Sequence, residues 1–125
     1  MIKTFNKITG NQGEAIAISY LEKNRFQIIE TNFKLKFGEI DIIAIKPNKQ
    51  NETVYHFVEV KYRKSDKFGT GLDAVTSTKQ RTIHRVATAY LLNKNLYNKV
   101  NTSFDVIAIM GQTNDYTIDH LEGCF

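Results

Sequence analysis

Two apolar segments of this sequence contain charged side chains at interior positions. The segments read GEIDIIAI (38–45) and HFVEVKYR (56–63); the charges flanked by apolar residues on both sides are Asp41 in the first and Glu59 and Lys61 in the second. Both segments are β-rich and should be buried on at least one face. A buried charge is costly unless it is paired or bound to a metal. Two carboxylates and an ammonium brought together by such a hairpin therefore indicate a divalent-metal site able to hydrolyse phosphodiesters.

The strand geometry shows how the site would work. Residues two apart on a strand share a face and lie about 6.6–7 Å apart, so Glu59 and Lys61 point the same way. If residues 46–53 form a short turn, Asp41 lies near the same level on the neighbouring strand. Two carboxylate oxygens and an adjacent backbone carbonyl suit Mg²⁺ or Mn²⁺. The metal would polarise a phosphoryl oxygen and lower the pKa of a bound water. Lys61 would either orient that water or offset the developing negative charge.

The alternative is a buried ion network of Asp41, Glu59 and Lys61 that only fixes the register of the hairpin. Such networks occur in proteins of many functions. The D…E-x-K order on adjacent strands, beside the bend at Gly38 and in a basic chain, favours catalysis over the network.

Length and composition predict a single soluble domain, residues 1–125, with one hydrophobic core. The net charge of +4 is compatible with a polyanionic partner. Cys124 is the only cysteine, so an internal disulfide and CxxC metal chemistry are excluded. The N-terminal residues MIKTFNKITG contain no apolar core of signal-peptide length, and the sequence has no apolar run of membrane-spanning length. We therefore expect a cytoplasmic protein that makes no membrane contact.

The N-terminal part predicts a helix that carries a further acid. Thr9 and Gln12 fit a capping box, which opens a helix running to about Asn24. Glu14 lies on the same face as the apolar residues of this helix, Ala17, Ile18 and Leu21. It is interpreted either as an acid that supports the metal or as a charge that favours the helix macrodipole.

The rest of the chain predicts an α/β domain. Strands within 26–37, at about 39–46 and at about 53–63 have short connections, which indicates an antiparallel meander. Residues 64–72 are predicted to form a mobile loop. Ser77 and Gln80 offer a second capping box for a helix to about Lys94, with Ile83, Val86, Ala87, Tyr90 and Leu91 on its buried face. Strands at 104–110 and 116–121 complete an αβββαββ order, with helices flanking a mixed sheet.

This order of motifs resembles a known family. A helix with Glu14, then GEID, then FVEVKYR, a Gly-containing loop, a basic helix with KQR and a closing FDVIAI strand are similar to the YraN-like predicted endonucleases of bacteria. More broadly they resemble the PD-(D/E)xK superfamily, which has a restriction-endonuclease-like fold and includes Holliday-junction resolvases. The resemblance covers residues 11–125. It departs at Ile40, where the superfamily often has proline without a catalytic role.

The resemblance implies roles for individual residues. Asp41 and Glu59 correspond to the metal carboxylates, Lys61 to the motif lysine, and Glu14 to a helix acid that supports the metal. Gln80 stands where many superfamily members have a site-facing Gln or Lys, although it could instead close the capping box with Ser77. The expected phosphate contacts are the basic residues Arg63, Lys64, Lys67, Lys79, Arg81 and Arg85; an ordinary solvated surface remains the alternative for each.

Other polar residues are interpreted as structural. His56, His84 and His120 lack mutual metal-ligand spacing, and each is expected to be structural or exposed. Asp105 is expected to tie down a turn or a basic side chain.

The sequence thus predicts a Mg²⁺- or Mn²⁺-dependent endonuclease that acts on nucleic acid, DNA in preference to RNA. So small a domain has little surface for sequence readout, so structure-selective action resembling that of Holliday-junction resolvases is expected, with a homodimer as an option. Two rivals remain: a nucleic-acid-binding module that keeps the fold without turnover, and an interaction domain with a purely structural ion network.

Overall fold

The computed structural model describes residues 8–63 and 75–125. Its elements are the helices α1 (Gly10–Lys23) and α2 (Ser77–Asn93) and the strands β1 (Gln27–Leu35), β2 (Gly38–Pro47), β3 (Thr53–Arg63), β4 (Asn101–Gln112) and β5 (Asp115–Leu121). They follow in the predicted αβββαββ order, which confirms the expected α/β class. The loop expected at 64–72 lies outside the described residues. Within the described residues, no helix is long and apolar enough to cross a membrane.

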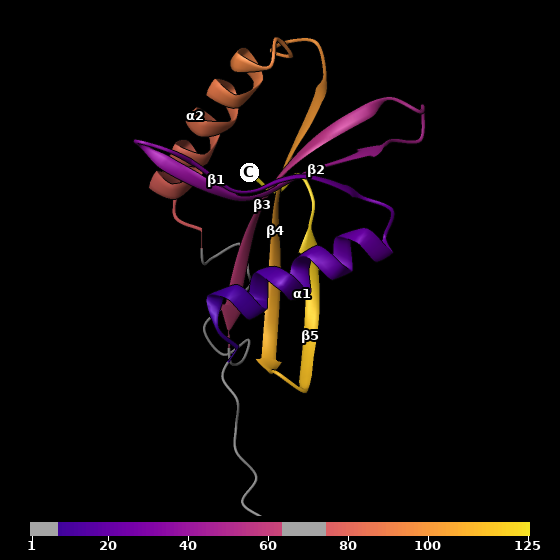
Figure 1. Cartoon of the computed structure of the whole chain (residues 1–125), viewed down its shortest axis with the longest axis vertical. Helices are drawn as coiled ribbons and strands as arrows, with labels where there is room; N and C mark the ends of the chain where they lie inside the picture. The colour runs from indigo at the N-terminus through magenta and orange to yellow at the C-terminus, as the bar shows by residue number, and fades with distance from the viewer. Residues whose placement is uncertain (1–7, 64–74) are drawn as a thin grey trace, which may run out of the picture.

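One mixed sheet organises the chain, with the strands in the order β1-β2-β3-β4-β5. β1, β2 and β3 pair antiparallel, so the predicted meander is confirmed. β4 pairs parallel with β3 and antiparallel with β5. A parallel pair needs a long crossover connection. Here the chain between β3 and β4 contains α2, which packs back onto the sheet (Figure 1).

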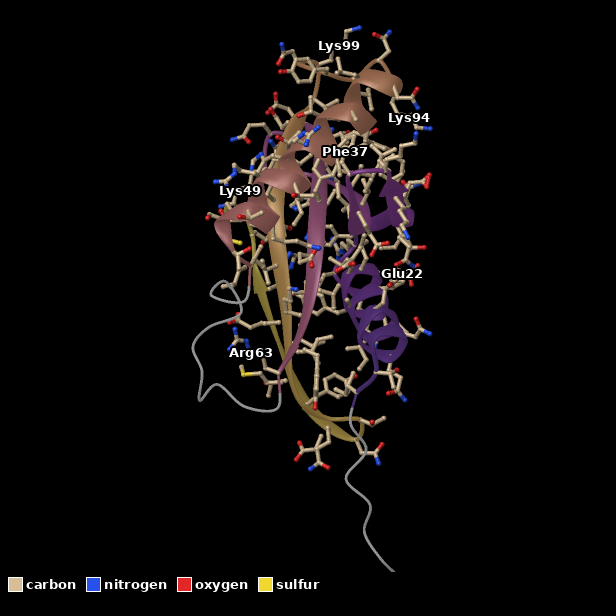
Figure 2. All side chains as sticks on the ribbon, turned by 90° about the vertical axis from the view of Figure 1, so that its left-hand side faces the viewer. Glu22, Phe37, Lys49, Arg63, Lys94 and Lys99 are labelled. Atoms are coloured by element: carbon tan, nitrogen blue, oxygen red, sulfur yellow. The ribbon has the colours of Figure 1, made fainter. Side chains whose placement is uncertain are left out.

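The two helices cover opposite faces of the sheet (Figure 2). On one face α2 buries the residues predicted for it, Ile83, Val86, Ala87, Tyr90 and Leu91. On the other face α1 buries Gly13, Ala17 and Leu21, while Ile18 is only partly buried. Each face thus has its own apolar cluster, and the acids of β2 and β3 lie in strands shared by both clusters.

The helix starts agree with the sequence at α1 and differ by one residue at α2. The Thr9 hydroxyl accepts the Gln12 N–H at 3.2 Å and Gln12 Oε1 accepts the Thr9 N–H at 2.9 Å, which confirms the first capping box. The predicted box of Ser77 and Gln80 is wrong. Thr76 caps α2 by accepting the Lys79 N–H at 3.1 Å, because it offers the same hydroxyl one residue earlier.

Gly38 fixes how β2 lies against α2. A Cβ atom at this position would overlap the Thr82 methyl group and lie 3.1 Å from Val86 Cγ2. The Thr82 side chain is held in place because its hydroxyl donates to the Thr78 carbonyl at 3.1 Å. The first residue of β2 therefore touches α2 directly, and this contact positions Asp41 three residues further along the strand.

We expect Gly38→Ala to lower the free energy of unfolding by about 1–3 kcal/mol, because an added methyl group overpacks this contact. Urea unfolding would measure the change. Gly10→Ala is the matched control: a Cβ atom there would meet no neighbouring group within 4 Å, and alanine favours a helix. Thr82→Ser removes the clashing methyl group and should recover part of the loss. Equal stabilities of the two alanine variants would contradict the proposed contact.

Candidate active site at the β2–β3 junction

Asp41 and Glu59 lie where β2 and β3 stop pairing. The antiparallel register runs from Pro47 opposite Thr53 to Ile42 opposite Val58. The next step of that register would place Asp41 opposite Glu59. Instead of a backbone pair, the Asp41 carboxylate accepts the Val60 N–H at 2.8 Å through Oδ2. The Asp41 side chain thus replaces the backbone ladder, and it lies beside the segment that carries Glu59 and Lys61.

Glu59 is an unusual buried acid. The residue is 4% exposed. Its Oε1 lies 3.4 Å from the Lys61 ammonium and 3.8 Å from the Lys79 ammonium, which reaches the site from α2. Its Oε2 is buried and has no hydrogen-bond partner among the described residues. Most buried side-chain oxygens are hydrogen-bonded, so this one calls for a ligand or another explanation.

The electrostatics of the two acids favour a bound cation. Burial raises the pKa of Glu59, and the charge of Asp41 raises it further, against partial compensation by Lys79 and Lys61. Burial also raises the pKa of Asp41, and Glu39 adds to this, against the hydrogen bond from Val60 and the two lysines. Burial outweighs the two lysines at both carboxylates, and a divalent cation would lower the cost of keeping them ionised.

Glu14 comes to the same region from α1. Its Oε1 accepts the Asn32 side-chain N–H at 2.7 Å, and Asn32 lies in β1 with a left-handed φ of 51°. Burial raises the pKa of Glu14, and the charge of Asp41 raises it further. The macrodipole explanation is not supported, because the first turn of α1 contains no acid and the dipole effect falls off within that turn.

The donor set fits a hard divalent cation held chiefly by Asp41 and Glu59. Carboxylates, a backbone carbonyl and water are ligands that suit Mg²⁺ and Mn²⁺. Glu14, Asp41 and Glu59 do not together form a group whose ligand atoms all lie within 4.8 Å of one another in the described parts of the chain. In this geometry the three acids therefore do not all bind one ion directly.

Other predicted site residues have different surroundings. The Gln80 amide donates to the Val75 carbonyl at 3.0 Å, which ties down the entry to α2; its catalytic role stays a prediction. Arg81 donates to the Thr78 hydroxyl at 3.4 Å, and Arg85 lies over the Phe37 ring. Arg63 lies at the end of β3, beyond Lys61 (Figure 2). Lys64 and Lys67 lie outside the described residues.

Asp105 is the centre of a second buried cluster, whose histidines are too far from it in the sequence to be grouped with it by any local pattern. Its Oδ2 accepts from His56 Nδ1 at 2.7 Å and His120 Nε2 at 2.9 Å. Its Oδ1 accepts from the Ser103 hydroxyl at 2.6 Å and the Gly123 N–H at 3.1 Å. Asp105 thus ties down a turn, as expected, and the two histidines are structural.

This cluster could also offer metal ligands. His56, Asp105 and Glu122 have ligand atoms within 4.8 Å of one another. However, both Asp105 oxygens already have hydrogen-bond partners, and Glu122 is largely exposed. Burial raises the pKa of Asp105, but the hydrogen bonds from His120, His56 and Ser103 outweigh it and hold the pKa well below its ordinary value. The cluster is explained as a structural link between β3, β4 and the segment after β5.

The mixed sheet, its two flanking helices and the acid-bearing β2–β3 junction define a restriction-endonuclease-like α/β protein. The family model described as "Uncharacterised protein family UPF0102" matches residues 13–109. The chain belongs to this family, the YraN-like group that the motifs indicated.

Curated relatives match over nearly the whole chain. It is 42% identical to a UPF0102 protein of Alkaliphilus oremlandii, over 96% of this chain and 99% of that one. It is 40% identical to one of Clostridium botulinum, over 99% and 98% of the two chains. A Geobacter sulfurreducens relative is 42% identical, over 96% and 90%.

We expect Asp105→Asn to lower the free energy of unfolding by about 3 kcal/mol, because it disrupts a buried charged network. The lowered pKa also gives a pH dependence. The stabilisation is full above the ordinary aspartate pKa and is lost as pH falls through the folded-state pKa. Thermal unfolding between pH 7 and pH 3 should therefore show a steeper acid loss for the wild type than for the variant. Parallel curves would contradict this role for Asp105.

We expect Asp41→Asn to raise the melting temperature of the metal-free protein at pH 7 by a few degrees, the scale of about 1 kcal/mol in a domain of this size. Because the folded-state pKa of Asp41 is raised, ionisation of this acid costs stability once the pH rises above its ordinary pKa. Asparagine removes that charge and keeps an acceptor for the Val60 N–H. Mn²⁺ should raise the melting temperature of the wild type and have little effect on the variant. A stabilisation by Mn²⁺ that is equal in both proteins would exclude Asp41 as a ligand.

Proposed function

We propose that this protein is a metal-dependent nuclease that hydrolyses phosphodiester bonds in nucleic acid, with DNA favoured over RNA. The observation that carries the proposal is the buried Glu59 carboxylate, whose Oε2 lacks a hydrogen-bond partner among the described residues, beside Asp41. A structural ion network would be expected to use both oxygens. An acid pair that keeps one oxygen free in a buried position is suited to a cation.

Each side chain of the site has a task in this chemistry. Asp41 and Glu59 would hold Mg²⁺ or Mn²⁺, and Glu14 would support it through water. When bound, the metal supplies Lewis acidity and a water of lowered pKa. Lys61 is about one-third exposed and lies 3.4 Å from Glu59. Its ammonium can therefore touch both the acid pair and a phosphate in solvent, where it offsets the negative charge of the transition state.

The surface of α2 supports a polyanionic substrate. The helix sequence STKQRTIHRVATAYLLN contains no Asp or Glu. Lys79 lies in its first turn, where a cation is unfavourable for the helix but adds to the positive field of the N-terminus. Arg81 and Arg85 follow on its exposed surface. The helix thus gives up some stability and presents positive charge beside the acid pair, which suits phosphate contacts.

The substrate preference follows from size. The domain has little surface for reading base edges, so we propose structure-selective cleavage, as in Holliday-junction resolvases. The proposal also places the enzyme in the cytoplasm, with a homodimer as an option.

One observation favours the rival, a nucleic-acid-binding module without turnover. Glu59 Oε1 already pairs with Lys61 and Lys79, as it would in a structural network. The same basic surface would then bind nucleic acid while the acids only stabilise the hairpin.

A panel of branched, flapped, single-stranded and fully paired DNA and RNA, with Mg²⁺ or Mn²⁺, tests the proposal. We expect cleavage by the wild type and a loss of at least about 100-fold in Lys61→Ala and Asp41→Asn, the scale of removing one group that stabilises transition-state charge. Lys99→Ala is the matched control, because this exposed lysine follows α2 at the far end of the molecule from Arg63 (Figure 2). It should cut like the wild type.

Two other outcomes would contradict the nuclease. Salt-sensitive binding without cleavage on every substrate and with both metals would identify the binding module. An absence of binding at low salt would leave only an interaction domain.

A further inference from the structure

An exposed aromatic side chain lies at the tip of the β1–β2 hairpin. Phe37 is 42% exposed, although a phenylalanine loses favourable burial at such a position. The guanidinium carbon of Arg85 lies 4.4 Å from the centre of its ring. The cation therefore covers part of the ring, and the rest stays open to solvent. Figure 2 labels Phe37 beside α2.

The ring stands on a rigid support. The next residue, Gly38, packs directly on Thr82 and Val86 of α2, with no room for a Cβ atom. Arg85, which lies over the ring, belongs to the same helix. The backbone next to Phe37 and the cation over its ring are therefore both fixed to α2. A rigid aromatic surface loses little conformational entropy when a flat ligand binds to it.

Two paths through the structure relate Phe37 to the acid pair. Asp41 follows Phe37 by four residues, about 13 Å along a strand. Arg85 follows Lys79, the partner of Glu59, by six residues, about 9 Å along a helix. Both paths place the ring within about four nucleotide steps of the acid pair, at a rise of about 3.4 Å per step on one duplex strand.

The surroundings of the ring carry positive charge. Lys34 and Lys36 are exposed on the hairpin, and Arg81 is exposed on α2 one turn before Arg85. Glu39 is half-buried and is the cross-strand partner of Lys34, so the exposed charges around Phe37 are mostly cationic. An aromatic ring among exposed cations matches the chemistry of a nucleotide, which stacks through its base and binds cations through its phosphate.

We propose that Phe37, together with Arg85, forms a stacking platform for an unpaired nucleobase of the substrate. The inference deepens the proposed nuclease function and rests on it. A paired base in a duplex has neighbours on both faces, so it cannot stack on a side chain without leaving the helix. The platform therefore selects substrates with an unpaired segment within about four nucleotides of the cleaved bond, such as flaps, gaps and open junctions, over continuous duplex.

Binding experiments can test the platform without any cleavage. The protein carries Lys61→Ala as a background, and fluorescence anisotropy measures its affinity for a flapped duplex, for the same duplex with abasic sites in the flap, and for a continuous duplex. We expect Phe37→Leu to weaken binding of the flapped duplex about tenfold, because stacking on an aromatic ring is lost. Affinity for the abasic and continuous duplexes should stay unchanged.

Two variants control this test. Phe37→Tyr keeps a ring and should bind like the background protein. Tyr97→Leu removes another exposed aromatic residue, which lies just before β4. The start of β4 pairs with the start of β3, so Tyr97 lies toward the end of the sheet that is remote from Glu59. It should leave all affinities unchanged. Thermal unfolding of each variant shows whether the fold is retained.

The outcomes separate this inference from the proposed function. The platform is overturned if Phe37→Leu binds each of the three ligands as tightly as the background protein does. It is also overturned if the variant loses the same affinity for all three. Either result holds even if the wild type cuts DNA. A base-dependent loss confined to the flap supports the platform, even where the wild type cuts no substrate and the nuclease proposal fails.

Discussion

The separation of β2 and β3 at Asp41 is the constraint on which the site depends. A regular ladder would place Asp41 and Glu59 opposite each other as like charges, which destabilises a strand pair. Here the Val60 N–H bonds to the Asp41 carboxylate, so the backbone donor is satisfied while the strands diverge. The two carboxylates are close enough to interact, because the charge of Asp41 raises the pKa of Glu59. A bound cation would lower the cost of burying both charges.

The two helices complete this region from opposite faces of the sheet. α1 brings Glu14, which Asn32 of β1 holds by a hydrogen bond. α2 brings Lys79 to Glu59, and Gly38 determines how closely the hairpin approaches that helix. Each group depends on packing between elements that are distant in the sequence. Changes in core packing should therefore affect the site as much as changes in the acids themselves.

Local patterns explain why the element order and the nearness of Glu59 to Lys61 can be predicted from sequence. Alternation places Glu59 and Lys61 on one face of β3, and the Thr9 hydroxyl marks the start of α1. The start of α2 was misplaced because Thr76 and Ser77 offer the same capping group in adjacent positions, and only the docked geometry decides between them. The contacts of Lys79 with Glu59 and of Asn32 with Glu14 could not be predicted, because they join segments whose relative placement is set by tertiary packing.

Asp105 and Glu59 are two buried acids with different surroundings. Four hydrogen bonds saturate the Asp105 oxygens and hold its pKa low, so the carboxylate is stable as an ion without any ligand. Glu59 has two lysines on one oxygen, no hydrogen bond on the other among the described residues, and a raised pKa. Burial alone therefore does not separate these two acids. The hydrogen bonding of the second oxygen does, and this difference is the reason that Glu59, and not Asp105, is proposed as a metal ligand.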